Sequence, residues 1–259
     1  MKRDGGMVTE FLIVCPLVFL AGFVDAIGGG GGLISLPAYL MAGIPAHFAV
    51  GTNKLSSAMG TTVATLEFAR SGYIRLKLAF LSVLAAIVGS SFGANMALHI
   101  SEYYFRLILL IVLPLTALYL LLNKHALNSK LADSAKLTGS QFVATLLISV
   151  SLGAWDGFYG PGTGTFLILT LVGIAHLPIN LAAGNTKVIN LTTNVTALAV
   201  FLLNDKVLIL LGLTAGIFSI VGNFLGASYY KKFGSAIARP IIIVVLLIFF
   251  AKTIWQFVS

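Results

Sequence analysis

The sequence predicts an all-α polytopic membrane protein built from two repeats of inverted topology. Three observations lead to this fold class. The 259-residue chain is 58% hydrophobic and only 9% charged, with a mean hydropathy of +1.02, whereas soluble domains carry about 25% charged residues. A glycine-rich break interrupts an apolar stretch in each half of the chain, and residues of the two halves correspond at one nearly constant spacing.

The repeat is visible in seven pairs of identical residues. Lys54 and Lys187 are 133 positions apart (187 minus 54), and six further pairs keep that spacing. This regularity indicates two structurally equivalent halves that meet at an interface. We therefore divide the chain into a first transmembrane repeat over 1–122, a cytoplasmic linker over 123–140 and a second repeat over 141–259. The further pairs are Gly51 and Gly184, Pro45 and Pro178, Phe68 and Phe201, Gly89 and Gly222, Gly93 and Gly226, and Arg106 and Arg239.

Each half contains five apolar segments, and their lengths predict how they meet the membrane. The second segments, Leu33–Gly43 and Thr165–Ala175, have 11 residues each, about half of the ~20 that cross a bilayer as a helix. We interpret each as a half-helix that forms a re-entrant hairpin with the segment before it, Phe11–Ile27 or Phe142–Phe158. Such a break is tolerated at membrane depth where protein covers it. The segments long enough to span are Phe48–Ala69, Leu76–Leu98, Tyr103–Leu122, Leu181–Leu203, Val207–Tyr229 and Ile237–Val258.

The charged loops predict the orientation. Basic residues gather around Arg75 and over 124–136 and 231–239, and we place these loops in the cytoplasm. The loops at Ile100 and Asn204 carry no excess of positive charge and are expected outside. The halves then enter from opposite sides, with both termini outside. These loops also account for the net charge of +8, so we expect no nucleic acid among the partners, only a small anionic substrate and the lipid bilayer. A homodimer is compatible with the sequence.

Two lysines within apolar spans are candidate site residues. Lys54 lies in the string GTNKLSS and Lys187 in GNTKVIN. A lysine at mid-membrane costs at least about 3 kcal/mol, so we expect each to pair with an acid or to bind an anion. The alternative is a side chain that reaches the membrane interface. Asp25 and Asp156 each precede a glycine break, where they could balance the lysines and carry coupling protons, or cap a helix instead.

The glycine breaks offer bare backbone N–H groups at the start of each half-helix. This arrangement binds anions, because the positive end of the helix dipole lies there. The alternative is close packing of helices, which small residues permit. Polar side chains near the lysines could donate hydrogen bonds to the substrate or join neighbouring helices. The candidate substrate-binding residues beside the lysines are Gly29, Gly30, Gly31, Thr52, Asn53, Gly162, Thr163, Thr186 and Asn190.

Other features are expected to be structural. The GxxxG patterns at Gly89 and Gly93, and again at Gly222 and Gly226, predict a seam between helices. His47 lies beside a loop proline, where a histidine more often packs than reacts. The single cysteine in the sequence allows no internal disulfide and no cysteine-based metal cluster, and we expect no metal or cofactor.

At this point the motifs resemble a known family. GFVDAIGGGGGLISLPA followed by GTNKLSS, with GAWDGFYGPGTGTF and GNTKVIN in the second half, is similar to the sulfite exporter TauE/SafE family, also called the toluene sulfonate uptake permease family. The resemblance covers nearly the whole chain. It implies a bacterial or archaeal carrier of the inner membrane for sulfur-containing anions such as sulfite, sulfoacetate and other organosulfonates. The second half reads Asn-Thr-Lys where the first reads Thr-Asn-Lys, so Asn185 matches the motif less well than Asn53.

These observations together predict a secondary transporter of small sulfur-containing oxyanions. No nucleotide-binding motif is present, so an ion gradient is the expected source of energy. One alternative is a proton- or cation-coupled antiporter of other substrates that uses Asp25 and Asp156. A membrane-embedded enzyme is less favoured, because the sequence has no histidine cluster and no HExxH or GxSxG string.

Overall fold

The computed structural model describes residues 3–122 and 137–233, and every helix or strand in these ranges is an α-helix. The elements follow the predicted segments closely, and the last predicted span, Ile237–Val258, lies outside the described residues. The first half contains α1 (Arg3–Gly28), α2 (Gly32–Met41), α3 (Ala46–Arg70), α4 (Leu76–His99) and α5 (Glu102–Leu122), and the second half contains α6 (Gly139–Phe158), α7 (Thr163–Gly173), α8 (Ile179–Leu203) and α9 (Ile209–Phe233).

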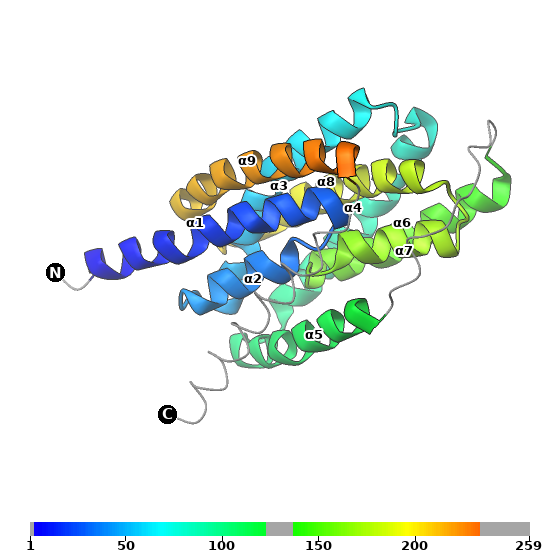
Figure 1. Cartoon of the computed structure of the whole chain (residues 1–259). Coiled ribbons are helices and arrows are strands. Elements are labelled where there is room, and N and C mark those ends of the chain that lie inside the picture. Colours follow the sequence, from blue (N-terminus) through cyan, green and yellow to red (C-terminus); the bar gives the residue numbers. More distant parts are fainter. Residues whose placement is uncertain (1–2, 123–136, 234–259) are drawn as a thin grey trace.

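The chain reverses at both glycine breaks, as the sequence predicts. Gly29 has a φ of 73°, and Gly160 and Gly162 have φ values of 97° and 82°, which L side chains rarely adopt. The short helix α2 therefore turns back beside the end of α1 (Figure 1), where Ile34 packs in one cluster with Ile27. Helix α7 packs in the same way on α6. Each break thus forms the tip of a helical hairpin.

The helix after each hairpin begins in the same way in both halves. Pro45 precedes α3 with φ −55° and ψ 148°, and Pro178 precedes α8 with φ −55° and ψ 142°. Proline suits this place because its ring fixes φ and because the missing N–H would have no partner within the helix. Two matched starts place Lys54 and Lys187 at the same depth from the beginnings of their helices.

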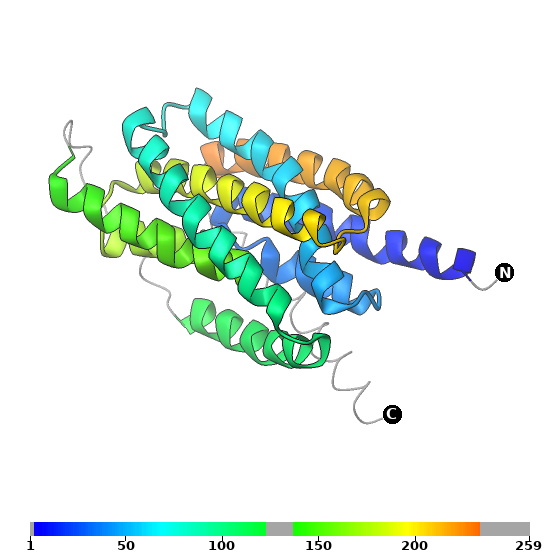
Figure 2. The same ribbon diagram turned by 180° about the vertical axis from the view of Figure 1, so that it is seen from behind.

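Contacts between the halves recur in matched pairs. Helix α4 packs on α6, and α9 packs on α1. The predicted glycine seam is confirmed, because a Cβ on any of its four glycines would meet the backbone of the facing helix. Helices α1 and α6, which the repeat relates, run through the bundle in opposite directions (Figures 1 and 2). In the seam, Gly89 and Gly93 face Val150 and Ala154, while Gly222 and Gly226 face Phe19 and Phe23.

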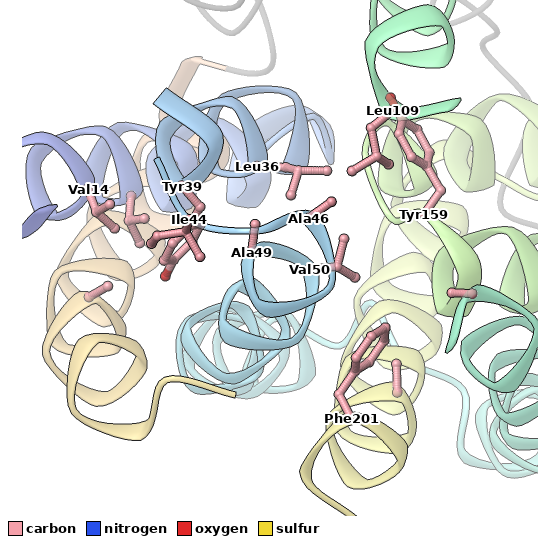
Figure 3. Packing of buried hydrophobic residues seen from close by; sticks show 14 of the residues in the cluster. Val14, Leu36, Tyr39, Ile44, Ala46, Ala49, Val50, Leu109, Tyr159 and Phe201 are labelled. Atoms are coloured by element: carbon pink, nitrogen blue, oxygen red, sulfur yellow. The ribbon is translucent and has the colours of Figure 1, made fainter. Parts of the chain in front are cut away.

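The apolar core lies beside the hairpin of the first half. Leu36 and Tyr39 of α2 pack there with Ala49 and Val50 of α3 (Figure 3), and Phe201 of α8 belongs to the same cluster. The outward faces of the helices are also apolar, with exposed side chains such as Phe80, Val88 and Phe92 on α4, Leu147 on α6 and Ile217 on α9. A soluble protein rarely exposes such a continuous apolar surface, whereas lipid would cover it.

Five segments of the described helices are long and apolar enough to cross a membrane. We predicted re-entrant arms over the segments of α1 and α6, yet both are long enough to span, although the chain reverses at their ends. Helix α3 has 25 residues but is not among the five. Its polar side chains, Lys54 among them, lower its mean hydropathy. We therefore predicted α3 as a span from its length and not from its hydropathy. The five segments are Thr9–Gly28, Leu76–His99, Gly139–Phe158, Ile179–Leu203 and Ile209–Tyr230.

Candidate functional site

The two hairpin tips touch one another inside the bundle. The backbone N–H of Thr165 donates to the carbonyl oxygen of Gly29 at 3.2 Å, and its hydroxyl donates to the carbonyl oxygen of Gly28 at 2.8 Å. A Cβ on either Gly29 or Gly164 would collide with the backbone of the other residue. Glycine is therefore required at this contact for space, and at Gly29 for its positive φ as well.

A polar cavity lies beside this contact. Residues of α1, α2, α3, α6, α7, α8 and α9 line it, together with glycines of both breaks. Its volume is ≈ 30 Å³ for water-sized molecules, against the ~10–15 Å³ that a single water needs. The cavity therefore has room for a few waters or a very small solute in this conformation.

The first buried ion pair joins the halves across the cavity. Lys54 Nζ lies 2.7 Å from Asp156 Oδ2, and the two side chains are only 1% and 3% exposed. Gly160 leaves room for this lysine, because a Cβ there would lie 3.2 Å from Nζ. A lysine of α3 in the first repeat is thus neutralised by the acid at the end of α6 in the second.

The second ion pair repeats the first with the halves exchanged. Lys187 Nζ of α8 lies 3.3 Å from Asp25 Oδ2 at the end of α1, with side-chain exposures of 1% and 13%. The same ammonium group donates to the backbone carbonyl oxygen of Asp25, and the Asn190 side-chain amide lies 3.5 Å from the carboxylate. Neither lysine reaches the membrane interface, so the alternative of a side chain extended to the interface is wrong for both.

The two pairs leave the site without net charge while its charged groups are buried. Removing one partner of a buried pair costs about 3–5 kcal/mol, because the other charge stays uncompensated. Each lysine, however, has three N–H donors and a carboxylate uses only some of them. The arrangement can therefore hold a second negative group if the balance of charge is restored by a proton or a cation.

The first glycine break adds backbone donors to this site. Among the described residues, the N–H groups of Gly30 and Gly31 have no hydrogen-bond partner, and Gly31 and Gly32 line the cavity. They lie at the N-terminus of α2, where the helix dipole favours negative charge. The cavity thus combines ammonium groups with open backbone donors.

The predicted site residues divide into two groups. Several of them line the cavity, but others are buried elsewhere with structural contacts. Thr52 accepts the backbone N–H of Leu208 at 2.9 Å, and the Thr163 hydroxyl donates to the carbonyl oxygen of Gly160 at 2.7 Å. Thr186, Gly30 and Gly162 also lie outside the lining. Lys187 does not line the cavity either, but it is paired with Asp25, which does. The predicted residues in the lining are Asp25, Gly29, Gly31, Asn53, Lys54, Asp156 and Asn190.

The structure also adds polar residues that our prediction missed. Ser219 and Asn223 of α9 line the cavity, as do Ser35 of α2 and Thr61 of α3. A signal was present, because Ser219 and Asn223 are polar residues four positions apart within an apolar span, and such residues commonly face the interior of a bundle. At the corresponding positions of the first half the repeat places an apolar residue, Ala86, and a polar one, Ser90.

His47 has a structural role, as predicted. Its Nδ1 lies 2.6 Å from Glu102 Oε2, its Nε2 lies 3.0 Å from the carbonyl oxygen of Ala97, and its ring stacks on Phe105. Glu102 also accepts the backbone N–H groups of Ala46 and His47 at the start of α3. Burial raises the pKa of Glu102, but these hydrogen bonds outweigh it and the pKa is lowered overall. Within the described ranges, no three histidine, cysteine or acidic side chains are grouped to hold a metal.

A helical bundle with apolar outer faces, two internally related halves and a charged cavity between their broken helices has the construction of a membrane transporter. Comparison with known proteins agrees, since the model of the family "Sulfite exporter TauE/SafE" matches residues 14–253. The chain belongs to this family and is a multi-pass membrane protein.

Relatives with similar sequences carry transporter names. The chain is 37% identical over 235 residues to "Probable membrane transporter protein ORF9" of Sinorhizobium sp, covering 91% of this chain and 88% of the relative. It is 35% identical over 239 residues to a "Probable membrane transporter protein" of Haemophilus influenzae, covering 92% of both chains. It is 32% identical over 247 residues to "Probable membrane transporter protein YfcA" of Escherichia coli, covering 93% and 88%. No solved structure matches the chain.

Proposed function

We propose that this transporter carries small sulfur-containing oxyanions, such as sulfite, sulfoacetate or other organosulfonates, across the inner membrane. One observation carries the proposal: two buried lysine–aspartate pairs cross between the halves beside the contact of the two glycine breaks. Cations and open backbone donors in one enclosed place suit an oxyanion. The family description, sulfite exporter, supports sulfur-containing anions as the class of substrate.

The charges of the site also indicate how transport is coupled. The empty site is balanced, so an entering anion leaves one uncompensated negative charge at membrane depth, which is costly. A proton on Asp25 or Asp156 would remove that charge and release the lysine to bind the anion. We therefore infer that the anion moves together with protons. The halves would rock about the contact between Gly29 and Gly164 to open the site to either side.

The test is flux of sulfite and of organosulfonates into proteoliposomes. Lys54→Met and Lys187→Met should each abolish this flux in protein that still inserts and folds. Lys77→Met is the matched control, because Lys77 is exposed and lies over the ring of Phe142, away from the cavity. An inward proton gradient should accelerate uptake. Flux of every tested anion at the rate of empty liposomes would refute the proposal.

A cation-coupled antiporter is the second candidate, and one observation favours it. Asp25 lines the cavity, and 13% of its side chain is exposed, so this acid is less completely enclosed than Asp156 at 3%. Thermal stabilisation by added ligand separates the two candidates. Stabilisation by sulfonate that is lost in both lysine variants supports the anion carrier. Unchanged stabilisation by sulfonate in both variants would rule out the anion role of the lysines and favour the antiporter.

A further inference from the structure

Asn223 carries one unpaired acceptor and is among the residues that line the cavity. Its side chain is 1% exposed and lines the cavity from α9. Among the described residues, its Oδ1 atom has no hydrogen-bond partner. A buried amide oxygen without a partner costs about 1–3 kcal/mol, so something that enters the cavity is expected to bind it.

The orientation of this amide is fixed by its neighbours. Nδ2 lies 3.0 Å from the backbone carbonyl oxygen of Ser219 and 3.4 Å from the Ser219 hydroxyl. A flipped amide would place its oxygen against that carbonyl oxygen, which has no hydrogen to donate. Both hydrogens of Nδ2 therefore point to Ser219, and the only part of this amide without a partner is its acceptor oxygen.

Asn223 fits between the neighbouring helices because two residues that face it are glycines, which have no side chain. A Cβ on Gly22 of α1 would lie 2.8 Å from Nδ2, and a Cβ on Gly60 of α3 would also collide with Nδ2. The amide is thus enclosed between three helices and does not occupy a loose position at the surface.

The duplicate position in the other half is built differently. Ser90 of α4 corresponds to Asn223 at the spacing of 133 (223 minus 90). Its hydroxyl donates to the backbone carbonyl oxygen of Thr193 at 2.8 Å, and Ser90 does not line the cavity. The unpaired acceptor is therefore not duplicated by the repeat, since Asn223 of the second half has it and Ser90 of the first half does not.

We propose that Oδ1 of Asn223 binds a hydrogen-bond donor of the substrate, so that the preferred substrate is a small sulfonate that also carries a hydroxyl or amino group. This inference rests on the proposed function and adds a second contact to the binding site, for the end of the substrate away from the sulfonate group. The sulfonate oxygens face Lys54 and the N–H of Gly31, and the donor group faces Asn223. An anion without a donor leaves Oδ1 unpaired, and a site that binds a polar group disfavours an analogue that lacks it.

The experiment compares two sulfonates of equal size. 2-Hydroxyethanesulfonate ends in a hydroxyl group where propane-1-sulfonate ends in a methyl group, and 2-aminoethanesulfonate tests an ammonium donor. Half-saturation concentrations are measured by thermal stabilisation of the full chain in detergent. We expect the hydroxyl compound to bind wild type on the order of tenfold more tightly than its methyl analogue. In Asn223→Leu the ratio should fall to about one, with Asn223→Ala as a second variant if leucine prevents folding.

Ser90→Ala is the matched control, because it alters the duplicate position outside the cavity and should keep the wild-type ratio. Equal affinity of wild type for the two sulfonates would overturn the inference and leave the proposed function intact. A preference that persists in the Asn223 variants would also overturn it and would indicate that Oδ1 is satisfied by water. If wild type binds no sulfonate at all, the proposed function fails and the inference fails with it.

Discussion

Replacing Lys54 with methionine tests the pairing of charges between the halves. The ammonium group lies 2.7 Å from Asp156 Oδ2, and the two side chains are 1% and 3% exposed, so water screens the pair very little. Removing the lysine leaves a buried carboxylate, at a cost of about 3–5 kcal/mol. We expect the melting temperature in detergent to fall on the order of 10 °C.

A second substitution identifies the partner. Lys54→Met with Asp156→Asn removes both charges and should recover most of the lost stability. Lys54→Met with Asp25→Asn is the matched control, because it leaves Asp156 uncompensated and deprives Lys187 of its carboxylate as well. This control should be less stable than Lys54→Met alone. Equal recovery by Asp25→Asn and Asp156→Asn would refute the pairing. Neither double variant should transport if Lys54 binds the substrate.

Three further predictions follow from other parts of the molecule. On a cysteine-free background, Arg75→Cys should be protected from a membrane-impermeant label added outside and Ile100→Cys should react, and the opposite result would contradict the inverted orientation. Gly29→Ala should lower the melting temperature strongly, because its Cβ would meet the backbone of the facing hairpin, whereas Gly173→Ala has open space and should change it little. Glu102→Gln should destabilise the start of α3 by about 1 kcal/mol at pH 7. Because the pKa of Glu102 is lowered in the fold, its stabilisation exists above the ordinary carboxyl pKa and disappears as the pH falls through the lowered one, so both proteins should then melt alike.

The two ion pairs make the halves depend on each other, because each lysine pairs with the aspartate of the other repeat. A movement of one half relative to the other therefore alters both ion pairs at once. A buried pair whose geometry worsens must be compensated by substrate, proton or cation. The ion pairs can thereby link occupancy of the site to the relative position of the halves, which is the requirement for coupled transport.

Sequence patterns located the helices because the causes are local. The apolar runs, the glycine breaks and the prolines before α3 and α8 act within a few residues, and nearly all described boundaries lie within three positions of those predicted. The two exceptions are the start of α1, which lies at Arg3, before the apolar run, and the end of α9, which lies at Phe233, four residues beyond the predicted Tyr229. The glycine seam was also predictable, because a GxxxG spacing marks one face of a helix wherever its partner lies.

The repeat in the sequence determined that Lys54 and Lys187 are equivalent and that each needs a partner in an apolar span. Only the tertiary structure decided which acid each lysine reaches, since a constant spacing fits a pair within a half as well as a pair between halves. The same limit explains Thr52 and Asn223. Polarity alone does not tell whether a side chain joins two helices, as Thr52 does, or presents an open acceptor to a cavity, as Asn223 does. That choice depends on what the facing helices bring within hydrogen-bond distance, and residues far apart in the chain supply those contacts.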